Sequence, residues 1–231
     1  MFQSVVIASV RPETRAMCVV RLELSGTPLA GTYTRPGQYV KARFAGEEAK
    51  FAFASAPARA ASADGVEILV KQGGTVGDAL CASAPGTRIE LSKPTGRGFP
   101  VDDARGRSLL LCAAGSGIGP IRAVIQYVIE RRAAYRDVTL IYGQRAEEDF
   151  AFSSEHAGWQ KAGIDVVTVH SRPGASEFAG VRGYVQDALR SIKPEVADAW
   201  AFLCGMQGMV EGATSALVEL GMPRAHIFLN Y

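Results

Sequence analysis

Residues 108–128 read S-L-L-L-C-A-A-G-S-G-I-G-P-I-R-A-V-I-Q-Y-V, and this stretch decides how the second half of the chain folds. Leu109 to Ala114 form a short, continuous apolar run, which is typical of a strand buried on both faces. A glycine-rich turn follows at once. Beyond it, apolar residues recur every three or four positions from Ile121 to Val128, as they do on one face of a helix. The stretch therefore predicts a strand, a tight loop and a helix.

The loop of this unit, Gly115 to Pro120, is suited to bind phosphate. The first backbone N–H groups of a helix have no partner within the helix and carry the positive end of its dipole. Gly115, Gly117 and Gly119 lack the Cβ atoms that would hold a pyrophosphate away from these groups, and Pro120 is tolerated in a first helical turn. The spacing matches neither G-x-G-x-x-G nor the Walker sequence. An ordinary glycine-rich turn between strand and helix is therefore the alternative.

Length and composition are those of a soluble globular protein with two small domains. The chain has 231 residues, of which 48% are hydrophobic and 21% charged. A formal net charge of +2 gives no reason to expect nucleic acid as a partner. The sequence has no run of about 18 apolar residues, so we expect no membrane span. Its N-terminus is typical of a first strand rather than of a signal peptide.

The four cysteines stand far apart, at Cys18, Cys81, Cys112 and Cys204. They form no C-x-x-C pair and have no histidine beside them, which argues against a zinc or iron–sulfur site. This usage fits a reducing compartment. We therefore expect a cytoplasmic protein without a metal site, in which most of the cysteines are small buried side chains.

Two different patterns divide the chain. Residues 1–100 predict short strands at 4–10, 16–24, 38–44, 50–56, 65–71 and 87–91, with one helical turn at 76–82. Residues 107–231 predict strands at 109–113, 138–142, 165–170, 201–204 and 226–230. Helices are expected between them at 121–134, 152–162, 185–191 and 207–220. We expect a six-stranded antiparallel β-barrel followed by an α/β domain with a doubly wound parallel sheet, which binds ligands at the carboxyl ends of its strands.

In this order the segments resemble the ferredoxin–NADP reductase superfamily, in which a flavin-binding barrel precedes an NAD(P)-binding domain. The motifs that carry the resemblance are R-P-G-Q-Y-V (35–40), A-S-A-P (54–57), G-G-T-V-G-D-A-L (73–80), G-S-G-I-G-P (115–120), Y-G-Q-R (142–145), G-Y-V-Q-D (183–187) and L-C-G-M-Q-G-M (203–209). F-A-F-A-S-A-P (51–57) and E-L-S-K-P-T-G-R-G-F (90–99) are most similar to the branch of the plant fruit protein pKIWI502.

The resemblance implies a flavin site with one departure. The flavin motif of the family is Arg-x-Tyr-Ser/Thr, and Ala49, Phe51 and Ala52 stand at these positions. Phe51 can still pack on a flavin ring, but Ala49 offers no guanidinium for the flavin phosphate. The residues that the resemblance assigns to flavin are Phe51, Ala52, Phe53, Ala54, Ser55, Gly74, Thr75 and Val76. Lys71 either replaces the missing arginine or is a solvated lysine.

The resemblance also implies a dinucleotide site. Gly115, Ser116, Gly117, Ile118, Gly119 and Pro120 would receive the pyrophosphate, and Arg145, Ser171, Arg172 and Tyr184 would hold the ribose, its phosphate and the adenine. Cys204, Gly205 and Met206 would lie near the nicotinamide. There Cys204 would position the reacting carbon, since hydride transfer needs no nucleophile. Tyr231 either covers the flavin and moves aside before transfer or packs on the sheet edge.

The function that follows is an NAD(P)H-dependent flavin oxidoreductase, with FAD or FMN as flavin and NADPH or NADH as hydride donor. Arg35, Lys41, Arg43, Lys93 and Arg97 would face an acidic electron-carrier protein. Two alternatives stay open because of Ala49 and Ala52. One is a reductase that uses free flavin as a substrate, and the other is a non-catalytic nucleotide-binding or regulatory subunit that has lost flavin.

Overall fold

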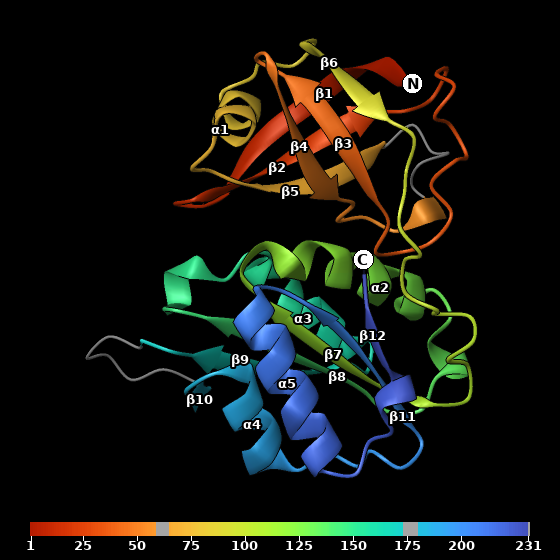
Figure 1. Ribbon diagram of the computed structural model, residues 1–231, viewed down its shortest axis with the longest axis vertical. Helices are drawn as coiled ribbons and strands as arrows, with labels where there is room; N and C mark the ends of the chain where they lie inside the picture. Colours follow the sequence, from red (N-terminus) through yellow and green to blue (C-terminus); the bar gives the residue numbers. More distant parts are fainter. Residues whose placement is uncertain (59–64, 173–179, 231) are drawn as a thin grey trace.

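The computed structural model describes residues 1–58, 65–172 and 180–230, and it shows two domains stacked on one another (Figure 1). The N-terminal domain is a six-stranded antiparallel sheet with the order β4-β3-β6-β1-β2-β5. The C-terminal domain is a six-stranded parallel sheet with the order β10-β9-β8-β7-β11-β12. Both halves confirm the predicted fold class.

The antiparallel sheet closes into a barrel. Its elements are β1 Phe2–Thr14, β2 Met17–Glu23, β3 Tyr39–Phe44, β4 Glu47–Ala52, β5 Val66–Lys71, α1 Thr75–Cys81 and β6 Arg88–Ser92. The two end strands meet because Phe53, just beyond β4, pairs with Ile68 of β5. The N–H of Ala54 then donates to the carbonyl of Glu67 at 2.7 Å. Closure leaves the sheet without a free edge at this seam.

In the parallel domain, helices cover both faces of the sheet. Its elements are β7 Ser108–Ala114, α2 Ile118–Ile129, β8 Val138–Gln144, α3 Ser153–Lys161, β9 Asp165–His170, β10 Val181–Arg182, α4 Val185–Ile192, β11 Ala199–Cys204, α5 Gln207–Glu219 and β12 Ile227–Leu229. In β7, Leu109 and Leu111 pack in the cluster that contains α2 and α3 residues. Leu110 and Cys112 pack with residues of α4 and α5. This alternation explains why the strand is apolar throughout.

Two boundaries and one strand that differ from the predictions have a physical reason. β4 begins earlier, at Glu47, and ends at Ala52, because residues 53–55 leave the strand to close the barrel. Helix α2 begins at Ile118, directly after a 3₁₀ turn at Gly115–Gly117, and not at Ile121. The short edge strand β10 was not predicted, since two residues carry no alternating pattern.

The cysteine prediction is wrong at two positions. Cys18 of β2 and Cys81 at the end of α1 form a disulfide with Cα atoms 5.7 Å apart. The two cysteines are 63 residues apart, and this spacing does not indicate a disulfide. Two cysteines can pair only if the fold brings them close in space, which the local sequence does not show. Cys112 is buried as predicted, and Cys204 is half-buried.

The domains share part of their core. Met17, Val19, Ala54 and Leu69 of the barrel pack in the same cluster as the apolar side chains of α2. Phe99, in the segment that joins the domains, belongs to this cluster as well and stacks on Phe202 of β11 at 5.0 Å. In the part of the chain that the structure describes, no helix is long and apolar enough to cross a membrane.

Candidate functional site

A cavity of ≈ 620 Å³, here called the sheet-edge cavity, opens where the parallel strands end. The residues predicted for the dinucleotide that line it are Gly115, Ser116, Arg145, Ser171, Arg172, Tyr184 and Met206. They follow the ends of β7, β8, β9, β10 and β11, and the parallel topology brings these strand ends to one edge. The cavity therefore lies where doubly wound sheets bind their ligands.

The glycine-rich loop divides into an open and a packed part. Gly115, with φ of +59°, and Ser116 face the cavity. Gly117 is packed so tightly that a Cβ there would lie 2.2 Å from the carbonyl oxygen of Cys204. A Cβ on Gly119 would lie 3.4 Å from Ala54 of the barrel. All three glycines were expected to leave room for a pyrophosphate. Among them only Gly115 does so, whereas Gly117 and Gly119 are required by close packing.

The rest of the predicted loop is also buried. Ile118 and Pro120 are covered, and neither lines the sheet-edge cavity. Ile118 packs in the shared cluster between the domains. The first turn of α2 therefore packs against the barrel. Gly115 and Ser116, which precede Gly117, are the part of the loop that a ligand in the cavity can contact.

In the lining of the sheet-edge cavity, a backbone hydrogen bond joins two arginines. The N–H of Arg172 donates to the carbonyl of Arg145 at 2.9 Å, and both side chains are exposed. Tyr184 precedes α4 and is 60% exposed, with its N–H held by the carboxylate of Asp187 at 2.9 Å. Two guanidinium groups beside an exposed phenol suit a phosphate next to an aromatic base.

Cys204 ends strand β11 and lies beside Ala113 of β7. Burial raises the pKa of its thiol to about 12, so the side chain is neutral at physiological pH. It does not appear among the residues that line the sheet-edge cavity, whereas Met206 does and is 69% exposed. Gly205 fits closely, since a Cβ there would lie 3.2 Å from the backbone nitrogen of Ala114. We do not expect a thiol that stays protonated to act as a base or nucleophile.

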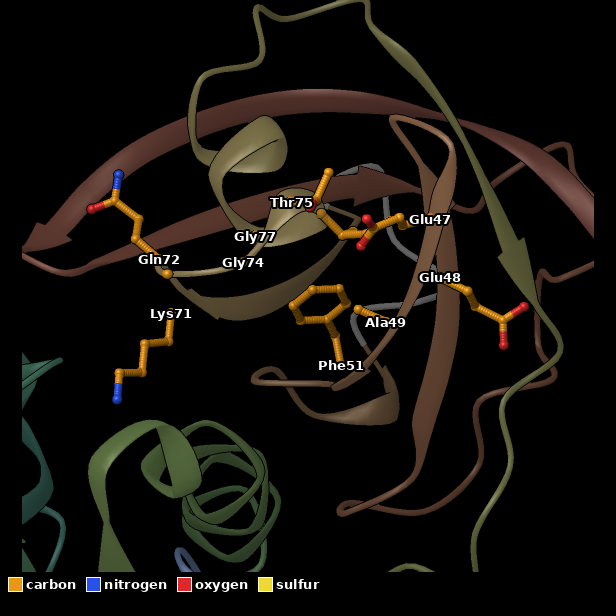
Figure 2. Close-up of a pocket in the computed structure, with 11 residues that line it drawn as sticks. Glu47, Glu48, Ala49, Phe51, Lys71, Gln72, Gly74, Thr75 and Gly77 are labelled. Carbon is orange, nitrogen blue, oxygen red and sulfur yellow. The ribbon is translucent and has the colours of Figure 1, made fainter.

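A second cavity of ≈ 400 Å³, the barrel cavity, lies between β4 and the start of α1. Figure 2 shows the ring of Phe51 directed into it, below the turn that carries Gly74 and Thr75. Gly74 at the start of α1 makes no side-chain cap, while the N–H of Gly73 just before it donates to the carboxylate of Asp78 at 2.9 Å. The N–H groups after Gly73 in this turn are those that an acceptor would use. Val76 also lines the cavity, although its side chain is buried.

The charges around the barrel cavity are mostly negative. Glu47 and Glu48 line it beside Ala49, and Glu48 is bound to Lys41 at 2.9 Å. The hydrogen bond to Lys41 outweighs desolvation and lowers the pKa of Glu48. Lys71 is the cation that lines the cavity, and in Figure 2 its side chain extends toward the C-terminal domain. The residues present fit a flavin ring on Phe51, with one lysine and backbone amides for its phosphate.

The predicted segment after Phe51 does not reach this cavity. Phe53 is fully buried and stacks on Tyr33 with ring centroids 4.1 Å apart. Ala54 and Ser55 are fully buried too, and the hydroxyl of Ser55 accepts a hydrogen bond from the N–H of Glu67 at 2.9 Å. Ala52 is half-buried and is not part of the lining. These four side chains close the barrel, and Tyr231 lies outside the described residues.

The two cavities share one lining residue, Lys71. The tip of the β1–β2 hairpin, residues 14–17, also reaches across from the barrel to the sheet-edge cavity. Arg15 at this tip pairs with Asp149 of the C-terminal domain at 3.1 Å. Sequence reasoning missed the hairpin tip, because its partners lie more than 100 positions away and only the polar turn P-E-T-R-A hinted at it.

Sequence reasoning also missed Arg122, a buried arginine between the domains. Its side chain on α2 is 8% exposed and contacts Glu155 of α3 at 2.7 Å and Glu67 of β5 at 2.6 Å. It donates as well to the carbonyl of Ala54 at 2.7 Å. Burial by itself would lower the pKa of the guanidinium, but the two glutamates outweigh burial and hold it above its usual value.

A closed antiparallel barrel followed by a doubly wound domain, with adjoining cavities at their junction, defines a two-domain class of nucleotide-binding proteins. Residues 111–215 match the family model of the oxidoreductase NAD-binding domain. The chain is 30% identical to the fruit protein pKIWI502 of Actinidia deliciosa over 229 residues, which is 91% of this chain and 71% of that protein. The chain belongs to the ferredoxin–NADP reductase superfamily, as the sequence motifs predicted.

One further relative and two solved structures are similar to this chain. Sulfhydrogenase 1 subunit gamma of Pyrococcus furiosus is 28% identical over 94% of this chain and 74% of its own length. A cytochrome P450 reductase from Amycolatopsis has the same fold, with a TM-score of 0.84 and 24% identity over 99% of this chain and 69% of that one. A Neisseria gonorrhoeae ferredoxin–NADP⁺ reductase with bound FAD and NADP matches with a TM-score of 0.80, at 20% identity over 99% and 97% of the two chains.

Proposed function

We propose that the protein is an NAD(P)H-dependent flavin oxidoreductase, in which a dinucleotide in the sheet-edge cavity reduces a flavin in the barrel cavity. The observation that carries this proposal is that Lys71 lines both cavities, so ligands placed in them would adjoin. A bound flavin supplies the hydride acceptor and the electron transfer that follows. The protein would supply alignment and exclusion of water.

The dinucleotide half of the proposal is supported by the exposed groups along the sheet-edge cavity. Gly115 and Ser116 line it and would receive a pyrophosphate, and Arg145 and Arg172, which line it too, would bind a phosphate or ribose. Tyr184 is exposed enough to stack on adenine. Cys204, Gly205 and Met206, at the end of β11, remain assigned to the nicotinamide end by their position in the family pattern. Both NADPH and NADH are candidates.

The flavin half is supported by Phe51 and by the uncapped start of α1. Phe51 would pack on the ring, Gly74, Thr75 and Val76 would offer backbone N–H groups to phosphate, and Lys71 would supply the positive charge. FAD is the flavin we propose, with FMN as the variant that uses the same groups.

Electrons would leave to a protein or small acceptor. Of the five basic residues predicted to face an acidic carrier, Lys41 and Arg43 are paired with glutamates of their own sheet, at 2.9 Å to Glu48 and 3.7 Å to Glu90. Arg35, Lys93 and Arg97 are exposed and are the ones we propose for such a contact. Relatives such as the reductase component of a Rhodococcus jostii propane 2-monooxygenase support this type of partner.

The purified protein tests the proposal directly. A yellow protein with flavin absorbance that NADH or NADPH bleaches under anaerobic conditions would support it. Oxidation of both nicotinamides should be followed with no added flavin, with FAD and with FMN. A protein that neither binds flavin nor oxidises either nicotinamide under any of these conditions would contradict the proposal and favour a non-catalytic nucleotide-binding or regulatory subunit.

The second candidate is a flavin reductase that releases its flavin after reduction. Ala49, with Glu47 and Glu48 beside it, favours this candidate because it leaves the barrel cavity without a guanidinium for the flavin phosphate. A colourless protein whose nicotinamide oxidation depends on added flavin, with saturation by that flavin, would identify it.

A further inference from the structure

Arg122 joins the two halves of the proposed site through one buried side chain. It stands on α2, which follows directly from the loop that lines the sheet-edge cavity. Across the domain boundary it donates to the carboxylate of Glu67 at 2.6 Å and to the carbonyl of Ala54 at 2.7 Å. Ala54 is three residues beyond Phe51, in the segment that closes the barrel.

The second glutamate holds the guanidinium from its own domain. Glu155 of α3 accepts from Nε of Arg122 at 2.9 Å, and the guanidinium lies 4.4 Å from the ring centroid of Phe152. The guanidinium of Arg122 thus pairs with two carboxylates, one from each domain. Because the group is planar, the directions of all its hydrogen bonds are fixed. A lysine could keep the charge but not this set of directions.

We infer that Arg122 is a positioning residue, which with Glu67 and the carbonyl of Ala54 sets the distance between the dinucleotide and the flavin. This inference rests on the proposed function. Hydride transfer requires reacting atoms about 3–3.5 Å apart, and a misplacement of about 1 Å can cost on the order of a hundredfold in rate. Arg122 stands on the helix that follows the loop at the sheet-edge cavity, and it contacts the segment that follows Phe51 at the barrel cavity. A shift of this side chain would therefore move one cavity relative to the other.

Other contacts keep the domains together when this one is weakened. The N–H of Ala56 donates to the side chain of Gln126 at 2.9 Å, and Arg15 pairs with Asp149 at 3.1 Å. The shared apolar cluster adds to them. Loss of the Glu67 contact should therefore loosen the alignment of the domains without separating them.

Glu67→Gln and Glu155→Gln form a matched pair that tests the inference in the full-length protein. The first removes the charge that crosses the domain boundary, and the second removes the charge within the C-terminal domain. For each variant we would measure the Kd of FAD, the Kd of the nicotinamide dinucleotide and the single-turnover rate of flavin reduction. Arg122→Lys serves as a third variant that keeps the charge and loses the fork.

For Glu67→Gln we expect the flavin reduction rate to fall at least about tenfold while both Kd values stay within about threefold. Glu155→Gln should keep its rate within about threefold, and Arg122→Lys should fall between the two. An unchanged rate in Glu67→Gln, or an equal loss in both glutamine variants, would overturn the inference. Either result would show that Arg122 only stabilises the fold.

A measurement without cofactors separates this inference from the proposed function. Hydrogen exchange of residues 53–58 and of α2 should be faster in Glu67→Gln than in Glu155→Gln, since only the former weakens one of the two contacts that Arg122 makes with the barrel. Equal exchange in the two variants would contradict the inference. If the wild type fails to bind flavin, the proposed function is wrong. The hydrogen-exchange comparison would then still show whether Arg122 holds the barrel segment against α2.

Discussion

Phe51 is the side chain whose proposed contact with flavin can be tested most directly. Its ring is directed into the barrel cavity (Figure 2), and it is half-buried there. Stacking of an aromatic side chain on a flat ring is worth about 0.5–1.5 kcal/mol beyond the buried area. We expect Phe51→Ala to raise the Kd of FAD roughly tenfold, about 1.4 kcal/mol, as measured by quenching of flavin fluorescence.

Phe2→Ala is the control for this substitution, because Phe2 is a half-buried phenylalanine of the same barrel that packs under Arg43 and lines neither cavity. Equal weakening of flavin binding by both substitutions would argue that Phe51 acts through barrel stability rather than through contact.

Cys204 allows a prediction on pH. Because burial raises the pKa of its thiol to about 12, the group stays protonated across the range in which the enzyme can be studied. Between about pH 6 and 9, the rate of flavin reduction should depend on pH in the same way in the wild type and in Cys204→Ser. A pH–rate profile of the two proteins measures this, and an ionisation lost in the serine variant would show that the thiol takes part in proton transfer.

At the scale of elements, the junction between β7 and α2 depends on Gly117. An alanine there would bring its Cβ within 2.2 Å of the carbonyl oxygen of Cys204, so the loop or the end of β11 must move. We expect Gly117→Ala to lower the free energy of unfolding by roughly 1–3 kcal/mol, as overpacked sites do, and to weaken dinucleotide binding. Urea denaturation and a dinucleotide titration measure the two effects.

Gly158→Ala is the matched control for Gly117→Ala. Gly158 lies within α3, and a Cβ there would meet nothing within 4 Å. Helix propensity favours alanine over glycine by about 1 kcal/mol, so this variant should be at least as stable as the wild type. A similar loss of stability in both variants would rule out close packing as the cause.

The Cys18–Cys81 disulfide fastens α1 to β2 and thereby the turn that borders the barrel cavity. A disulfide stabilises a domain mainly by restricting its unfolded chain, typically by 2–4 kcal/mol. We expect reduction by dithiothreitol to lower the free energy of unfolding by about that amount, measured in urea.

The double variant Cys18→Ser/Cys81→Ser should unfold like the reduced wild type and should not respond to the reductant. If thiol titration finds no increase on reduction of the denatured wild type, the disulfide does not form in the purified protein and the prediction is wrong.

At the scale of the molecule, the shared core predicts cooperative unfolding. Met17, Val19, Ala54 and Leu69 pack with α2, and Phe99 packs with β11, so unfolding of either domain exposes apolar surface on the other. Trp159 and Trp200, the two tryptophans of the chain, both lie in the C-terminal domain.

Tryptophan fluorescence therefore reports on that domain, whereas far-ultraviolet circular dichroism reports on both. We expect the two urea transitions to coincide within about 0.2 M. Two separate transitions would show that the interface contributes little to stability. Partial separation in Glu67→Gln alone would agree with the contact between Arg122 and Glu67.

Much of the candidate site could be predicted because it lies on local patterns. The run from Leu109 to Pro120 predicted a strand, a loop and a helix, and Gly115 and Ser116 of that loop line the sheet-edge cavity. Arg172 stands in a polar segment at the end of a predicted strand, but its assignment to the dinucleotide, like that of Tyr184, came from the family resemblance. Patterns of this kind depend on neighbours a few positions away, which the sequence displays directly.

The residues that were missed depend on partners far away in the chain. Arg122 appears in the sequence as one polar residue on an otherwise apolar helix, and its partners are 33 and 55 positions distant. Phe53 and Ser55 follow Phe51 in the motif, but the turn that closes the barrel directs them into the core. No local pattern distinguishes a side chain that faces a ligand from one that faces a distant strand.

The sequence by itself determined the two domains, the order of their strands and helices apart from β10, and the loops at the sheet edge, because periodicity and turn residues act over short distances. Only the tertiary structure decided that Cys18 meets Cys81, that Lys71 borders both cavities and that Arg122 bridges the domains. These contacts arise when the barrel closes and packs against the C-terminal domain. Burial of apolar surface provides the favourable free energy, and the charge of Arg122 can be buried because two carboxylates pair with it.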